Sequence, residues 1–158
     1  MFVCGVLASP LLYAKGSTAA AAAACTDAGK CPYFSDIYKA DAAVRSAFSE
    51  AMGKAGIKKL SWFPKGVNAP ITPILIGDGT YISSQMCEPH NCGAQGLDFL
   101  YRPDQKRAVG RLQSEEGKST WFGSPTPAEQ KAIVEMADEN SAINKALSAG
   151  KPLPLRAD

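Results

Sequence analysis

Apolar residues recur three or four positions apart between residues 35 and 56, and this spacing predicts an amphipathic helix. The apolar positions are Ile37, Ala40, Val44, Ala47, Phe48, Ala51 and Met52. Ser35 or Asp36 is suited to cap the start of the helix, and glycines follow its end. A stripe of this kind serves burial against a core, so we expect the helix to pack rather than to carry a functional site.

From residue 60 the pattern changes to short β-rich runs separated by turns rich in Gly, Pro, Asn and Asp. The runs cover residues 60–63, 71–76, 80–86, 96–102, 106–113 and 119–123. Parallel pairing would need crossover helices between the strands, and the connections are too short to hold them. The sequence therefore predicts an antiparallel meander.

A second helical pattern covers residues 126–147 and begins with a capping-box arrangement of Thr126 and Glu129. A break at residues 138–141 predicts two helices, and the proline-containing tail after them is expected to run extended. The predicted class is α+β, with an antiparallel sheet of about five strands and the N- and C-terminal helices packed on one face. Aromatic side chains such as Trp62, Phe63, Trp121 and Phe122 are expected to fill the core.

Length and charge limit the possible functions. The chain has 158 residues, 46% of them apolar, which suits one globular domain. Its formal net charge is +2 without a long run of one sign, so neither nucleic acid nor an anionic membrane is indicated as a partner.

The N-terminal residues resemble a secretory signal. An apolar run over residues 2–14 leads to small residues that end in three alanines before Cys25, as at an A-x-A cleavage site, although Pro10 interrupts the run and no Lys or Arg precedes it. The run is shorter than the ~20 residues that span a bilayer. We expect residues 1–24 to be a signal peptide and residues 25–158 to be one domain in the periplasm, with lipidation of Cys25 as the less favoured alternative.

Four cysteines would remain after such a signal is removed: Cys25, Cys31, Cys87 and Cys92. An even number in an exported chain indicates disulfides, and four cysteines allow three connectivities. We favour the local pairs, Cys25 with Cys31 and Cys87 with Cys92, because each closes a short loop bounded by polar or turn-forming residues.

The segment 86–93, "MCEPHNCG", places the only histidine of the chain between two cysteines. A disulfide between Cys87 and Cys92 would restrict the loop, and Pro89 fixes one further backbone angle. Closing so small a ring stabilises a protein by about 2 kcal/mol, so its larger effect is local stiffness. Strands lead into and out of this loop, so it should project from the end of the sheet with His90 at its tip.

Four interpretations of the loop compete. Zinc binding by its two cysteines and histidine lacks a fourth ligand and crowds three donors into six residues. Catalysis by the histidine, with Ser83 or Ser84 as nucleophile, lacks a clear orienting carboxylate, Asp98 being the nearest candidate. In the third interpretation, the loop is a simple turn closed by a disulfide, with an exposed histidine. In the fourth, it is a rigid probe for the cleft of another protein.

The motif "CEPHNC", preceded by "GDGTYISSQM" and followed by "GAQGLDFLY", resembles the protruding loop of the inhibitor of vertebrate lysozyme (Ivy) family of Gram-negative periplasms. The similarity extends from about residue 33 to the last helix. The family pattern of two cysteines, a proline and a histidine is present here, whereas Glu88 and Asn91 occupy variable positions that carry lysine and aspartate in some relatives.

The resemblance implies a non-enzymatic inhibitor of c-type lysozyme that helps bacteria to evade host defence. Its loop would enter the active-site cleft and place His90 between the two catalytic carboxylates, with no cofactor, metal or small-molecule substrate. The protein would be a monomer or homodimer, and restraint of the cell's own lytic transglycosylases is a further expectation. The other predicted partner contacts are the remaining loop residues 87–92 and, on the flanking strands, Tyr81, Tyr101 and Arg102. A metal-binding or thiol-redox periplasmic protein is the alternative.

Overall fold

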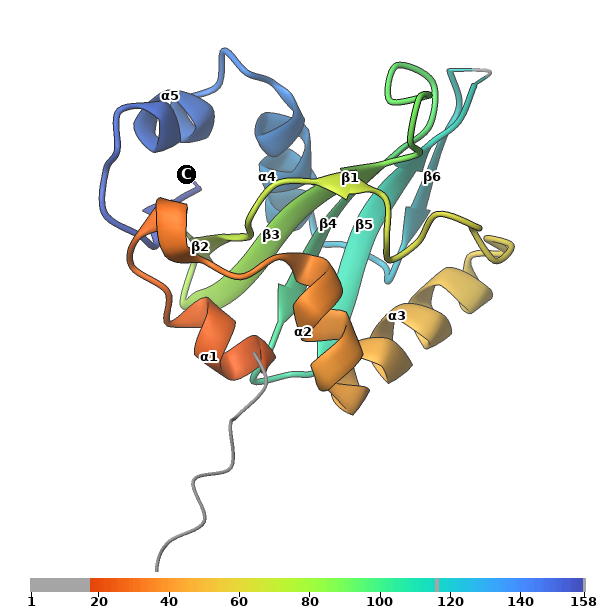
Figure 1. Ribbon diagram of the computed structural model, residues 1–158, viewed down its shortest axis with the longest axis horizontal. Helices are drawn as coiled ribbons and strands as arrows, with labels where there is room; N and C mark the ends of the chain where they lie inside the picture. Colours follow the sequence, from red (N-terminus) through yellow and green to blue (C-terminus); the bar gives the residue numbers. More distant parts are fainter. Residues whose placement is uncertain (1–17, 116, 158) are drawn as a thin grey trace, which may run out of the picture.

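The computed structural model describes residues 18–115 and 117–157, and within them a seven-stranded sheet is flanked by helices (Figure 1). The strands are β1 Val67–Asn68, β2 Thr72–Ile76, β3 Gly79–Cys87, β4 Gly96–Arg102, β5 Arg107–Gln113, β6 Ser119–Phe122 and β7 Leu155–Arg156. Their order is β6-β5-β4-β3-β2-β7, with β1 paired to β3, and every pair is antiparallel except β2 with β7.

The α+β class and the antiparallel meander are therefore confirmed. Five strands, β2 to β6, are those expected from the sequence, and two-residue strands β1 and β7 raise the number to seven. The run 60–63 is not a strand, because it forms consecutive turns. The break between the two C-terminal helices lies where it was predicted, between Ala137 and Ala142.

The structure has five α-helices in its described part: α1 Ala19–Ala23, α2 Phe34–Ala40, α3 Ala42–Lys54, α4 Pro127–Ala137 and α5 Ala142–Ser148. The helix predicted over residues 35–56 is divided at Asp41, which has extended backbone angles. Its carboxylate accepts hydrogen bonds from the backbone nitrogens of Ala43, at 3.0 Å, and Val44. Asp41 thus ends α2 and caps α3, because a short acidic side chain satisfies the free N–H groups of a helix start.

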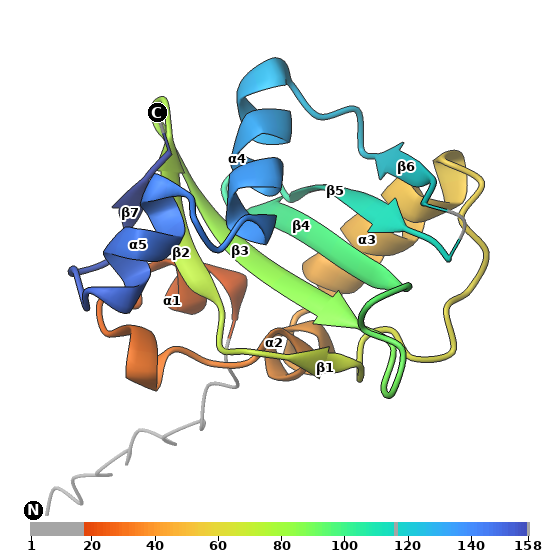
Figure 2. The same ribbon diagram turned by 90° about the horizontal axis from the view of Figure 1, so that it is seen from above.

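The prediction that helices from both ends of the chain share one face of the sheet is wrong. On one face, the hydroxyl of Ser83 in β3 lies 3.8 Å from the sulfur of Met136 in α4. The next residue, Ser84, points to the other face and stands opposite Phe99, whose ring contacts Phe48 of α3. The helices α2 and α3 therefore lie on one side of the sheet and α4 on the other, as Figure 2 shows.

The face under α2 and α3 holds an aromatic core. Phe34, Phe48 and Phe99 are at most 2% exposed, and the ring centroids of Phe34 and Phe99 lie 4.4 Å apart. Trp62 is buried and Trp121 is partly buried. The expectation that the aromatic residues fill the core is confirmed.

The N-terminal end of the described chain packs on the same core. Ala19 and Ala22 of α1 are each 2% exposed, and the backbone nitrogen of Ala19 donates to the Asp41 carboxylate at 3.0 Å. Residues 1–17 of the predicted signal lie outside the described residues, and the boundary at residue 25 stays a prediction. No helix in the described ranges is long and apolar enough to cross a membrane.

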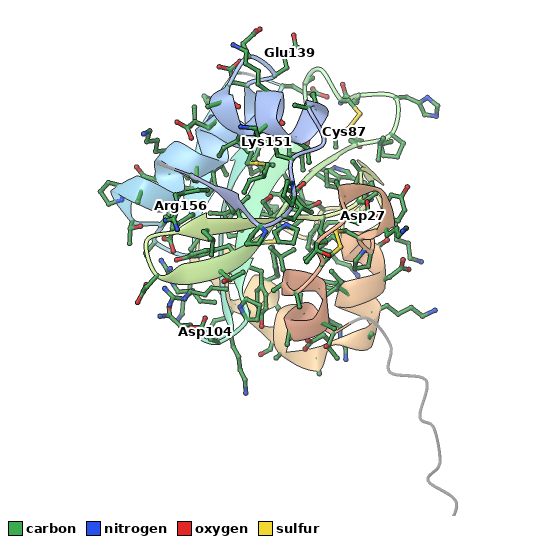
Figure 3. The ribbon with its side chains drawn as sticks, turned by 90° about the vertical axis from the view of Figure 1, so that its left-hand side faces the viewer. Asp27, Cys87, Asp104, Glu139, Lys151 and Arg156 are labelled. Atoms are coloured by element: carbon green, nitrogen blue, oxygen red, sulfur yellow. A yellow bond between two sulfur atoms is a disulfide. The ribbon has the colours of Figure 1, made fainter. Side chains whose placement is uncertain are left out.

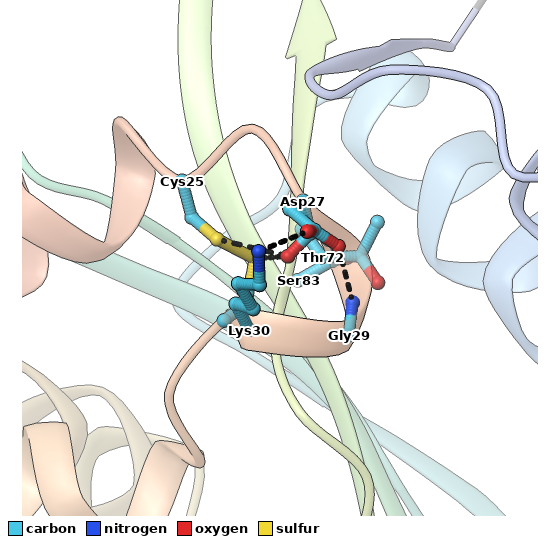
Figure 4. The surroundings of a disulfide bond; sticks show 7 residues. Cys25, Asp27, Gly29, Lys30, Thr72 and Ser83 are labelled. Carbon is cyan, nitrogen blue, oxygen red and sulfur yellow. Dashed lines mark hydrogen bonds and ion pairs between the residues drawn. A yellow bond between two sulfur atoms is a disulfide. The ribbon is translucent and has the colours of Figure 1, made fainter.

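A disulfide between Cys25 and Cys31 closes the segment that follows α1. Within it, the Asp27 carboxylate accepts from the backbone nitrogen of Gly29 at 3.1 Å and pairs with Lys30 at 3.2 Å (Figure 4). The disulfide therefore constrains most of the connection between α1 and α2.

Candidate functional site

Two connections project from the same end of the sheet. The chain leaves β3 at Cys87 and returns at Gly96, and it leaves β5 at Gln113 and returns at Ser119. Because β3 and β5 run in the same direction between antiparallel neighbours, both connections emerge at the same end of the sheet. Figure 1 shows the β3–β4 loop and the β5–β6 turn protruding together, away from the helices α1 and α2.

The β3–β4 loop is a closed ring. Cys87 and Cys92 form a disulfide with their Cα atoms 4.9 Å apart, as predicted. The backbone nitrogen of Asn91 donates to the carbonyl oxygen of Glu88 at 3.0 Å, so residues 88–91 form a β-turn.

His90 takes an uncommon backbone conformation in this turn. Pro89 precedes it with a negative φ fixed by its ring, and His90 has φ +66°, so the signs match a type II turn. That position favours Gly or Asn, and histidine is among the few other residues enriched there. Pro89 and His90 are both exposed, so the imidazole is held at the accessible tip of the loop.

The two variable positions of the loop face inward. Glu88 and Asn91 are half-buried, and the amide nitrogen of Asn91 lies 2.8 Å from Glu88 Oε2 and 2.9 Å from Glu115 Oε1. Glu115 belongs to the β5–β6 turn, so this amide joins the two projecting connections.

A polar network crosses the sheet beneath the loop. Asp98 is 6% exposed. Its carboxylate accepts hydrogen bonds from Gln85 of β3 at 3.0 Å and from Arg111 and Gln113 of β5, each at 2.8 Å. These contacts tie together the strands that enter and leave the loop.

The network also argues against a catalytic histidine. The Asp98 carboxylate is engaged by Gln85, Arg111 and Gln113, so it is not the orienting carboxylate of His90. The proposed nucleophiles Ser83 and Ser84 are 1% and 6% exposed within β3.

The flanking residues predicted as partner contacts lie elsewhere. Tyr81 and Tyr101 are 4% and 1% exposed, and burial, with a contribution from the charge of Asp41, raises the pKa of Tyr101 to about 12. Arg102 pairs with Asp104 at 2.9 Å, at the end of the sheet opposite Cys87 (Figure 3). Tyr81 is six residues before Cys87, about 20 Å along a strand. The structure therefore does not bring these three residues together with the loop.

A groove of about 750 Å³ adjoins the loop on the α4 face of the sheet. Its floor is polar, with Gln85, Asp98 and Gln113, and its wall includes Val67, an apolar residue that is 54% exposed beside Cys87.

Sequence reasoning missed Glu115, Gln85, Arg111 and Gln113. Their roles depend on which strands are neighbours, and the sequence gives no register between β4 and β5. The one available signal was the alternation of polar residues in β5, where Arg111 and Gln113 share a face.

The two cysteines that the zinc interpretation requires as ligands form a disulfide. The described residues hold no group of three or more His, Cys, Asp or Glu side chains that could bind a metal ion.

Comparison with known proteins identifies a family. The family model described as inhibitor of vertebrate lysozyme (Ivy) matches residues 43–147, more than half of the chain. No curated protein sequence matches the chain. The matched region contains the disulfide loop, the β5–β6 turn and α4 in full.

Proposed function

This chain belongs to the inhibitor of vertebrate lysozyme (Ivy) family, and we propose that it inhibits c-type lysozyme by inserting the loop closed by Cys87 and Cys92 into the active-site cleft. Family membership indicates inhibition of lysozyme as the activity, by a protein that is not itself an enzyme. The mode of inhibition is argued from the loop.

The chemistry of a lysozyme cleft suits an imidazole. Retaining glycosidases hold two carboxyl groups about 5 Å apart, one protonated and one ionised. An imidazole carries one nitrogen on each side of its ring, so His90 can hydrogen-bond to both groups, and it binds more strongly when protonated. The loop would then block the sugar-binding cleft and engage the catalytic acid together.

The observation that carries the proposal is the presentation of His90. The residue lies at the exposed tip of a ring whose backbone is fixed by a disulfide, a proline and a turn hydrogen bond. A side chain presented on a stiff loop loses little conformational freedom on binding, which favours affinity.

Replacement of His90 tests the proposal. His90→Gly removes the imidazole and accepts φ +66° without strain, whereas alanine, like the native histidine, carries a Cβ that costs about 1 kcal/mol at this φ. We expect the inhibition constant in a lysozyme turbidity assay to rise at least about 30-fold, as for an interface hot spot worth 2 kcal/mol.

The matched control is Glu139→Ala, at an exposed site between α4 and α5. It should inhibit as well as the wild-type protein. An unchanged inhibition constant for His90→Gly would remove the histidine from the mechanism.

Two wider expectations belong to the same proposal. The protein acts in the periplasm, where an oxidising environment maintains its disulfides. Lytic transglycosylases, which also depend on an acidic catalytic residue, are proposed as a second class of target, and assays with purified transglycosylase and the His90→Gly variant would test this.

A further inference from the structure

We propose that Glu115 is a positioning residue, which holds the inhibitory loop and with it His90 by binding the side chain of Asn91. Its effect on inhibition rests on the proposed function, whereas its effect on the order of the loop does not. The proposal gives the β5–β6 turn a role in recognition although it lies outside the disulfide ring.

The geometry at Asn91 is that of a bridge. Its amide nitrogen lies 2.8 Å from Glu88 Oε2 and 2.9 Å from Glu115 Oε1. An amide NH₂ group has two hydrogens, so it donates one to each carboxylate. The same contacts place a donor between two negative groups that would otherwise repel each other.

The loop has few other ties to the rest of the protein. The backbone hydrogen bonds of residues 88–95 are made within the loop, from Glu88 to Gln95, from Asn91 to Glu88, and from Ala94 and Gln95 to Asn91. From outside the loop, the side chain of Glu115 hydrogen-bonds to Asn91. Loss of this bond removes a contact that ties the loop to the β5–β6 turn and leaves the disulfide and the hydrogen bonds within the loop.

Glu115 itself sits on a defined turn. The backbone nitrogen of Ser114 donates to the carbonyl oxygen of Lys118 at 3.0 Å, and that of Gly117 donates to Ser114 at 2.9 Å. The carboxylate is therefore presented from a hydrogen-bonded hairpin end. Because Asn91 directly follows His90, fixing one restricts the other.

Two variants separate the hydrogen bond from the charge. Glu115→Ala removes both, whereas Glu115→Gln removes the charge and keeps an oxygen that accepts from Asn91. Glu115 is exposed, so both variants should unfold at the wild-type temperature. Glu139→Ala controls for loss of a negative charge far from the loop.

The first readout is backbone amide hydrogen exchange in the free protein, which needs no lysozyme. Exchange at Asn91, Ala94 and Gln95 should be several-fold faster in Glu115→Ala and near the wild-type rate in Glu115→Gln. The second readout is the inhibition constant, which should rise about fivefold in Glu115→Ala, the scale of one hydrogen bond, and little in Glu115→Gln.

Each outcome decides something. Unchanged exchange in Glu115→Ala, or equal effects of the two variants on inhibition, would overturn the positioning role. Faster exchange with an unchanged inhibition constant would overturn it as well. If the wild-type protein fails to inhibit lysozyme while Glu115→Ala alone loosens the loop, the proposed function fails and the bracing contact is supported.

Discussion

At the scale of single residues, the loop shows why its two variable positions belong together. Glu88 and Asn91 are paired by a hydrogen bond, and a lysine and an aspartate at the same positions could pair by charge. The two variable positions of the pattern C-x-P-H-x-C thus hold side chains that contact each other. Sequence reasoning identified the histidine and the ring, but the partner of Asn91 lies 24 residues away and no local pattern indicates it.

This pairing makes Asn91→Asp a sharp test. The substitution replaces a shared donor by a third carboxylate beside Glu88 and Glu115, so the loop should loosen and the inhibition constant should rise about fivefold, for a repulsion near 1 kcal/mol. Adding Glu88→Lys should restore most of the inhibition through a new ion pair. A double-mutant cycle on the inhibition constants measures this coupling, and strictly additive effects would contradict it.

A second residue-scale prediction concerns Glu129, at the end of the sheet opposite the loop. Burial opposes its ionisation, but hydrogen bonds from Arg107, Thr126 and Tyr81 outweigh this, so the pKa of the carboxyl lies below its usual value. A lowered pKa in the folded state stabilises the protein above the unfolded-state pKa, and the stabilisation is lost as the pH falls through the folded-state value.

Urea unfolding should therefore show a free energy of unfolding that decreases below about pH 4, near the usual carboxyl pKa. Glu129→Gln should reduce that decrease while lowering stability at neutral pH, because Arg107 then lacks its charged partner. A variant with the same acid dependence as the wild-type protein would show that other carboxyl groups control it.

At the scale of elements, the two disulfides provide a matched pair. They join cysteines six and five positions apart, so loss of either should lower the free energy of unfolding by about 2 kcal/mol. Only the second closes the inhibitory loop. The double variant Cys87→Ser with Cys92→Ser should weaken lysozyme inhibition at least about tenfold through loss of loop order, whereas Cys25→Ser with Cys31→Ser should leave it unchanged. Equal inhibition by both would show that stiffness is not required.

Helix α1 is expected to contribute to the stability of the fold. Two of its alanines are buried and its first backbone nitrogen binds Asp41. A protein that begins at Cys25 should be about 2 kcal/mol less stable than one that begins at Thr18, from two lost methyl contacts and the lost hydrogen bond. Chemical denaturation of the two forms measures the difference, and equal stability would favour a mature domain that starts at residue 25.

At the scale of the whole molecule, the strands were predictable and the layers were not. Runs of alternating or apolar residues between turn residues located β2 to β6. The short strands β1 and β7 carry no pattern of their own, because two residues pair only where the tertiary fold brings them to an edge. Asp41 divides a continuous apolar stripe, and capping rather than periodicity decides that break. The overlooked sequence signal was the nearly continuous apolar run of β4, at residues 97–101. Such a run is typical of a strand that is buried on both faces, as β4 is.

The placement of α1 far from the projecting loop has a practical consequence. In Figures 1 and 2 the described chain starts on the side of the molecule away from the β3–β4 connection. A bead, a dye or a fused carrier protein attached ahead of Thr18 would lie on the side of the molecule away from the β3–β4 loop. Such an attachment would leave His90 exposed to solvent, so binding of lysozyme to the immobilised protein could be measured directly.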